Sequence, residues 1–167
     1  MHHRIGGQIA NQAAALVLSC ALGWMLWSLL VGYAGHRLPL AALEHDNGLT
    51  RPRPWGETRS GYERNLRIRA WKKWLPDAGD LFPGGVRKQA LVGRDTTTLR
   101  RLVAETRRAE LVHVALWPFW LVTALWLPPE GVLINLVFDT AFNLPCLWVQ
   151  RFNRLRLMTA IEQSSKR

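Results

Sequence analysis

Acidic residues, cysteine and tyrosine are scarce in this sequence of 167 residues. Twelve Asp and Glu stand against 22 Lys and Arg, which gives a formal net charge of +10. The two cysteines, Cys20 and Cys146, fall inside apolar stretches, where we expect packing rather than a disulfide or a metal pair. Neither a cluster with metal-ligand spacing nor a nucleophilic serine motif occurs, so the sequence predicts no metal site and no serine nucleophile.

The excess of positive charge raises the question of the partner. Nucleic acid is one answer, but no recognition motif accompanies the charge, and we predict no nucleic-acid partner. The basic residues lie between and beside long apolar stretches, so anionic lipid headgroups are the expected counter-charge. Nine Trp against two Tyr agree with a lipid bilayer as the partner, because tryptophan rings favour the membrane interface.

Three long apolar stretches dominate the chain: residues 10–34, 111–127 and 132–149. About 20 apolar residues cross the hydrocarbon core of a bilayer, so each stretch is just long enough for a membrane-spanning helix. A cleaved signal peptide is the competing interpretation of the first stretch, but its length and its Trp24 and Trp27 favour an uncleaved helix. We therefore predict an all-α membrane protein with three transmembrane helices, folded as a single membrane domain over residues 1–167.

The segment Pro128–Gly131 predicts a turn, because two prolines cannot extend a helix and Gly tolerates the reversal. The second and third stretches then form an antiparallel hairpin. Basic residues fill the polar loop over residues 35–108 and follow the third stretch, whereas the turn carries only Glu130. The positive-inside rule places both basic segments in the cytoplasm. We expect a multi-pass protein of the cell membrane, with its N-terminus outside and its C-terminus inside.

Within the loop, Arg69–Leu75 alternates tryptophans with cations. An amphipathic segment of this kind commonly lies in the plane of the membrane interface, with its cations toward the lipid phosphates. A soluble helix with a solvated basic face is the alternative. Because apolar stretches flank the loop, we favour the interfacial segment.

Polar residues recur in the third stretch at helical spacing. Steps of four, four, three, four and three place them on one helical face: Asn135, Asp139, Asn143, Cys146, Gln150 and Asn153. Similar steps in and before the second stretch align Thr106, Glu110, His113 and Trp117. In an antiparallel hairpin Glu110 and His113 lie at the depth of Asn143 and its neighbours. Polar groups at membrane depth are costly and usually face a bundle interior, a cavity or a site.

This cluster favours proton-transfer chemistry at the cytoplasmic end of the hairpin. His113 can accept a proton from a hydroxyl, and Glu110 is placed to hold its ring. Guanidinium groups suit phosphate, and five arginines lie just beyond: Arg107, Arg108, Arg151, Arg154 and Arg156. The pattern fits transfer of a group from a phosphorylated carrier, such as an acyl thioester, to a lipid hydroxyl. The alternative is that these residues cross-link the hairpin and anchor it to lipid, with Asp139 protonated or paired with the first helix.

Four segments, taken in order, resemble one protein family: Arg69–Gly79, Glu105–His113, Asn143–Pro145 and Val149–Leu157. The string Glu-Thr-Arg-Arg-Ala-Glu-Leu-x-His and the string Gln-Arg-x-Asn-Arg-x-Arg are specific in combination. The chain is similar here to the glycosyl-4,4'-diaponeurosporenoate acyltransferases of staphyloxanthin-type carotenoid synthesis, over about residues 55–157. Asp139 and Cys146 lie outside the shared pattern.

The resemblance implies a small membrane enzyme that esterifies a sugar hydroxyl of a glycosylated carotenoid acid, or of a similar glycolipid, with a fatty acyl group. The partners would be the glycolipid acceptor and an acyl-CoA-like donor, with no cofactor. We predict His113 and Glu110 as catalytic residues. The predicted substrate-binding residues are the other matching positions: Glu105, Arg107, Asn143, Gln150, Arg151, Asn153 and Arg156. A motif of histidine and aspartate with four-residue spacing is absent. The alternative function is a non-catalytic membrane scaffold subunit of a lipid-modifying complex.

Overall fold

The described part of the chain is helical. The computed structural model describes residues 2–53, 57–75 and 95–166, and within these ranges it contains no strand, which confirms the all-α prediction. Its α-helices and 3-10 helices (η) are, in order, α1 (His2–Arg37), η1 (Leu40–Leu43), α2 (Arg59–Asn65), α3 (Ile68–Trp71), η2 (Lys72–Trp74), α4 (Thr96–Leu116), α5 (Phe119–Thr123) and α6 (Pro129–Ser164).

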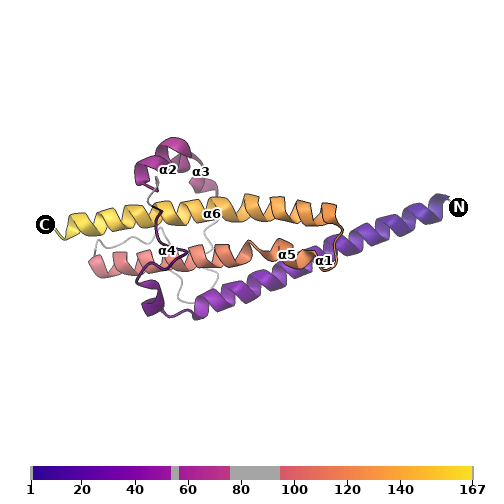
Figure 1. Cartoon of the computed structure of the whole chain (residues 1–167), viewed down its shortest axis with the longest axis horizontal. Coiled ribbons are helices and arrows are strands. Elements are labelled where there is room, and N and C mark those ends of the chain that lie inside the picture. Colours follow the sequence, from indigo (N-terminus) through magenta and orange to yellow (C-terminus); the bar gives the residue numbers. More distant parts are fainter. Residues whose placement is uncertain (1, 54–56, 76–94, 167) are drawn as a thin grey trace.

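The long elements lie side by side in an elongated bundle (Figure 1). α4 and α5 run against α6 in the opposite direction, as the predicted hairpin requires, and α1 packs obliquely against α4 and α5. The short α2 and α3 sit on the other side of α6. The two ends of the chain lie at opposite ends of the bundle.

The second apolar stretch is not one helix, and the prediction of three transmembrane helices over 10–34, 111–127 and 132–149 is wrong in this respect. α4 ends at Leu116 and α5 holds only Phe119–Thr123. Pro118 causes the interruption, because it has no N–H and its ring clashes with the carbonyl four residues back. Among the described residues, two helical segments have the length and hydropathy of a membrane span: Asn11–Arg37 and Pro129–Ser164.

The hairpin also reverses earlier than predicted. Pro129 and Gly131 belong to the first turn of α6, and Pro128 is the residue before the helix. A proline fits the first helical position because its missing N–H needs no partner there. At the other end α6 passes the predicted limit of 149 and continues to Ser164, with Pro145 inside it. The chain therefore turns between α5 and Pro128.

The predicted interfacial segment over 69–75 is split between α3 and η2 rather than forming one amphipathic helix. The indole of Trp71 turns inward and donates to the Leu66 carbonyl at 2.7 Å, next to a small core that includes Phe152. Trp74, by contrast, is 80% exposed. The segment thus presents one tryptophan to the protein and one outward. Residues 76–94 of the predicted loop lie outside the described residues.

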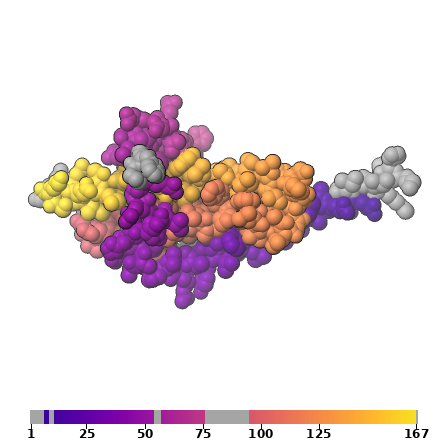
Figure 2. Space-filling model, viewed as in Figure 1, coloured from indigo at the N-terminus to yellow at the C-terminus, as the bar shows by residue number. Residues whose placement is uncertain are grey.

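α1 packs against α4 and α6 through two tryptophans and a glycine. Trp24 donates from Nε1 to Asn135 Oδ1 at 3.1 Å, and Trp27 donates from Nε1 to the Ala115 carbonyl at 3.2 Å. At Gly35 the helices approach so closely that an added Cβ would lie 2.4 Å from Val112 Cγ2. These contacts hold only the second half of α1. Its N-terminal part extends past the hairpin (Figure 2).

On α1 and on the first half of α6 the outward surface is apolar, and polar side chains of α6 lie inside. On α6 the exposed large side chains are Leu133, Ile134, Val137, Phe138 and Phe142, while Asn135, Asp139 and Asn143 are buried. On α1 the outward side chains from Leu16 to Tyr33 are also largely apolar. A water-soluble bundle has the opposite arrangement, because apolar surface is driven inward.

Candidate functional site

The predicted polar face of α6 points into the bundle. Asn135, Asp139, Asn143 and Gln150 are all buried, which agrees with their helical spacing. Asn135, Asp139 and Asn143 meet partners from α1, α5 and α4, respectively. Cys146 lies on the same face, and neither it nor Cys20 forms a disulfide among the described residues.

The pair that bears most directly on chemistry is His113 and Asn143. His113 Nδ1 lies 3.0 Å from Asn143 Oδ1, and the Asn143 Nδ2 donates to the Asp139 carbonyl at 3.1 Å. That second bond fixes the amide so that its oxygen faces the imidazole. An oxygen accepts, so Nδ1 carries the proton, and in the neutral ring Nε2 carries the lone pair. Asn143 therefore fixes both the orientation and the tautomer of His113.

Glu110 lies one helical turn from His113 and is fully buried. Its Oε1 accepts from Arg151 Nε at 2.6 Å, and its Oε2 accepts from Arg154 Nη1 at 2.5 Å. Arg154 is itself buried. A buried carboxylate is tolerated when each oxygen is paired in this way. Asn143, rather than Glu110, supplies the bond to Nδ1 of the histidine.

A segment of the loop lies over this ion pair, and we call it the strap (residues 43–53). Arg107 Nη1 donates to the carbonyls of Leu43 and Glu44, both at 3.0 Å, and its Nε bonds Asp46 at 2.7 Å. Arg151 and Arg154 donate to two further strap carbonyls, those of Leu49 at 2.7 Å and Thr50 at 2.5 Å. Three arginines of the hairpin thus hold the strap across its mouth.

Glu57 adds a second carboxylate to Arg151, with which it forms an ion pair. It also accepts from the Arg53 backbone at 2.7 Å and from the Tyr62 hydroxyl at 3.2 Å. Burial raises the pKa of Glu57, but the Arg53 and Arg151 hydrogen bonds outweigh it, so its pKa lies below the ordinary value. Burial raises the pKa of the Tyr62 phenol, and the nearby Glu57 carboxylate raises it further.

Deeper in the bundle, Asp139 accepts a backbone hydrogen bond where the helix is interrupted between α4 and α5. Its Oδ2 accepts from the Trp120 backbone N–H at 2.9 Å, although the sequence suggested protonation or a partner on the first helix. Trp117 Nε1 donates to Thr140 Oγ1 at 3.1 Å across the same seam. An interrupted helix leaves backbone N–H groups without intrahelical partners, and buried groups of this kind need substitute acceptors. Asp139 therefore stabilises the start of α5.

Several of the remaining predicted residues contact partners other than His113 and Glu110, or lie nearer the surface. Glu105 pairs with Arg108 at 3.1 Å along α4. Asn153 accepts from Lys72 Nζ at 3.3 Å, and the exposed Arg156 guanidinium lies 5.8 Å from the Phe152 ring centroid. Gln150 is buried, and its Oε1 has no hydrogen-bond partner within the described residues. The structure therefore gathers part of the predicted set and leaves Glu105 and Arg156 at its edge.

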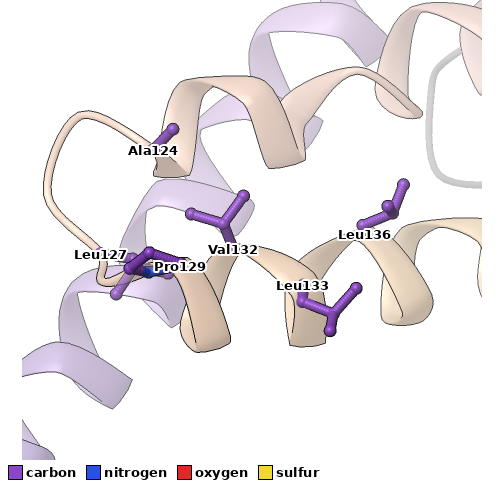
Figure 3. Close-up of a pocket in the computed structure, with 6 residues that line it drawn as sticks. All are labelled: Ala124, Leu127, Pro129, Val132, Leu133 and Leu136. Carbon is purple, nitrogen blue, oxygen red and sulfur yellow. The ribbon is translucent and has the colours of Figure 1, made fainter.

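An apolar groove of about 400 Å³ opens at the far end of the hairpin, away from this cluster (Figure 3). It is lined by α5, α6 and the turn between them, through Ala124, Leu127, Pro129, Val132, Leu133 and Leu136. No side chain in this lining can transfer a proton. In this respect the groove differs from the cluster around His113, which holds titratable side chains.

Sequence reasoning missed Asp46, Thr50 and Glu57, and it did not include Arg154 among the site residues. Arg154 carried a signal, since it lies four residues after Gln150 on the polar face. Asp46 and Glu57 carried no comparable signal, because other acidic residues are spread through the same loop. Their pairing with arginines distant in the sequence is visible only in the fold.

Comparison with known proteins agrees with the resemblance. The family model described as glycosyl-4,4'-diaponeurosporenoate acyltransferase matches residues 46–163. A Staphylococcus haemolyticus protein of that name is 29% identical over 62% of this chain, and the chain spans 60% of that relative's length. One from Staphylococcus aureus (strain USA300) is 24% identical over 83% of both chains. No solved structure matches.

Proposed function

The chain belongs to the glycosyl-4,4'-diaponeurosporenoate acyltransferase family, and we propose that it esterifies a sugar hydroxyl of a glycosylated carotenoid acid, or of a similar glycolipid, with a fatty acyl group. The family and the relatives are named as acyltransferases, which bears out the predicted enzyme class. The acceptor is proposed from those names, and the mechanism from the geometry of His113 and Asn143.

The proposed location is the cell membrane. The inverted surface of α6 supports it, because apolar side chains face outward around a polar interior. From Pro129 to Val149 the helix rises roughly 31 Å at 1.5 Å per residue, close to the thickness of a bilayer core. The ends of the chain lie at opposite ends of the bundle (Figure 1), and the arginines gather at the C-terminal side. This supports an N-terminus outside and a C-terminus inside.

In the proposed reaction His113 is the general base. Its Nε2 takes the proton of the sugar hydroxyl while the hydroxyl oxygen bonds to the acyl carbonyl carbon. The carbon–sulfur bond of a thioester donor then breaks, and the proton passes from Nε2 to the departing sulfur. Asn143 supports this role by holding the proton on Nδ1. That hydrogen bond is the single observation that carries the mechanism.

The other predicted site residues fall into two groups. Arg107 and Arg151 are held by carboxylates, so we propose that they position Glu110 and the strap. Arg156 is exposed, and its guanidinium lies 5.8 Å from the Phe152 ring centroid, as the Lys72 ammonium does at 5.0 Å. We propose Arg156 for the phosphates of an acyl-CoA-like donor. Gln150 offers an acceptor oxygen suited to a hydroxyl, and Asn153 and Glu105 lie at the rim of the same end.

The test is ester formation by His113→Ala in membranes that contain equal amounts of each protein. We expect turnover to fall at least about a hundredfold, the usual contribution of a positioned acid–base group. His36→Ala is the matched control, because His36 is an exposed histidine at the end of α1, outside the cluster and the strap. Undiminished turnover by His113→Ala would remove His113 from the mechanism.

A non-catalytic scaffold subunit is the second candidate, supported by the number of cluster bonds that join segments distant in the sequence. It predicts that His113→Ala lowers the amount of protein or the recovery of a partner, while a separately supplied enzyme accounts for the ester. Purified protein that forms ester by itself excludes this candidate.

A further inference from the structure

The strap covers the end of the hairpin that faces the aqueous side in the proposed orientation. We propose that it selects a sugar hydroxyl over water as the acyl acceptor, by sealing the mouth of the hairpin above His113 and Asn143. This inference rests on the proposed acyltransferase function and adds to it a determinant of acceptor specificity.

Burial shows how tightly the mouth is closed. Leu43 and Thr50 of the strap are 2% and 0% exposed, and beneath them Glu110 and Arg154 are 0% and 1% exposed. A surface loop seldom buries its own side chains and carbonyls against charged groups, since loops normally keep their polar backbone in water. The buried carbonyls of Leu43 and Thr50 accept from Arg107 and Arg154, so these two strap carbonyls are sealed from water with a donor in place.

The sealed layer lies between His113 and the aqueous end. Glu110 is three residues from His113, about 4.5 Å along α4, and Arg151 is eight residues from Asn143, about 12 Å along α6. His113 is nevertheless half-buried rather than enclosed, and Trp117 one turn deeper is 43% exposed. The open approach to His113 is thus along the side of the bundle, where the outward surface is apolar. Amphiphilic substrates can enter there from the bilayer, whereas bulk water is excluded.

Water exclusion matters because two acceptors compete for one acyl group. When the sugar hydroxyl attacks, its oxygen bonds to the acyl carbon, its proton passes through His113 to the leaving sulfur, and the products are ester and free thiol. When water attacks by the same route, the products are fatty acid and free thiol. His113 can activate either acceptor, so the ratio depends on which of the two reaches it.

The experiment measures that ratio with the full chain in vesicles of phosphatidylglycerol, supplied with a long-chain acyl-CoA and the glycosylated carotenoid acid. Ester and free fatty acid are quantified for wild type, Glu57→Gln, Asp46→Asn and the double variant. Hydrogen exchange of the amides in residues 43–53 reports strap opening in the same samples. We expect faster exchange and a fivefold to tenfold rise in the fatty-acid-to-ester ratio, roughly the shift in opening expected when a partly buried ion pair is lost.

Glu63→Gln is the matched control, since Glu63 pairs with Arg59 and Arg69 away from the strap, and we expect its ratio to equal that of wild type. The proposal is overturned if the strap exchanges faster while the ratio stays unchanged. It is also overturned if exchange stays slow even in the double variant, because the ion pairs then do not close the mouth. Failure of the wild type to form ester would refute the proposed function instead.

Discussion

Replacing Glu110 by glutamine tests whether the buried ion cluster holds the hairpin and strap together. The carboxylate is inaccessible, and its two oxygens bond Arg151 at 2.6 Å and Arg154 at 2.5 Å. In Glu110→Gln one oxygen becomes an amide group that faces an arginine with N–H donors. Arg151 keeps the Glu57 carboxylate, whereas among the described residues the one carboxylate left near Arg154 is that of Asp46, 4.0 Å away.

The expected loss in the free energy of unfolding follows from the weak pairing left to Arg154. Removing one partner of a buried ion pair leaves an uncompensated charge and costs about 3–5 kcal/mol. Glu105→Gln is the matched control on the same helix, because the Glu105–Arg108 pair is partly exposed and such pairs contribute less than about 1 kcal/mol. The free energy of unfolding, measured by denaturing-detergent titration in mixed micelles, should therefore separate the two variants by at least about 2 kcal/mol.

Equal losses in the two variants would refute this account of the cluster. The same samples test the catalytic role predicted for Glu110, through ester formation per folded molecule. A structural role leaves that turnover close to wild type at temperatures where Glu110→Gln is still folded. A further change, Glu110→Leu combined with Arg154→Leu, should recover part of the lost stability, because it removes both buried charges together.

Three further perturbations follow from particular contacts. Asn143→Leu removes the acceptor at Nδ1 of His113, and we expect turnover to fall about a hundredfold or more with little change in the amount of folded protein. Turnover equal to that of wild type would contradict the role of Asn143 in holding the proton on Nδ1. Gly35→Leu forces a side chain into Val112 and should lower the free energy of unfolding by about 1–3 kcal/mol, whereas Gly7→Leu, which meets nothing within 4 Å, should leave it unchanged. The pKa of Glu57 is lowered in the folded state, so its ion pair stabilises the strap above the ordinary pKa of 4.5, and that contribution is lost as pH falls. Hydrogen exchange of residues 43–53, corrected for intrinsic rates, should therefore accelerate below about pH 4.5. Slower exchange at low pH would contradict the stabilising role of the Glu57 ion pair.

The helical periodicity of the sequence was enough to predict the polar face of α6, because spacing of three and four residues fixes which side chains share a side. It also placed His113 and Asn143 at one depth, since an antiparallel hairpin brings the start of one helix to the end of the other. Distances between neighbouring helices then follow from packing. This is why the pair meets in the structure at 3.0 Å.

The errors have equally local causes. The apolar stretch over 111–127 includes Pro118, and a proline in that position ends a helix unless its neighbours compensate. The two consecutive prolines predict a turn that includes Pro129, but the first helical position accepts a proline. The strap could not be anticipated, because backbone carbonyls bound by arginines leave no pattern in the sequence. Which oxygen an arginine reaches depends on how the loop folds back.

The arginines at the mouth of the hairpin can act twice, first during insertion of the chain and then in the folded protein. In the proposed membrane orientation, Arg151 and Arg154 have not yet met their carboxylates while the chain is being inserted, and as cations they would favour retention on the cytoplasmic side. After folding, Glu110, Glu57 and Asp46 neutralise them. A substitution at Arg151 therefore disturbs both topology and stability, whereas one at Glu57 disturbs stability alone. Reporter fusions at the C-terminus can separate these two effects in growing cells.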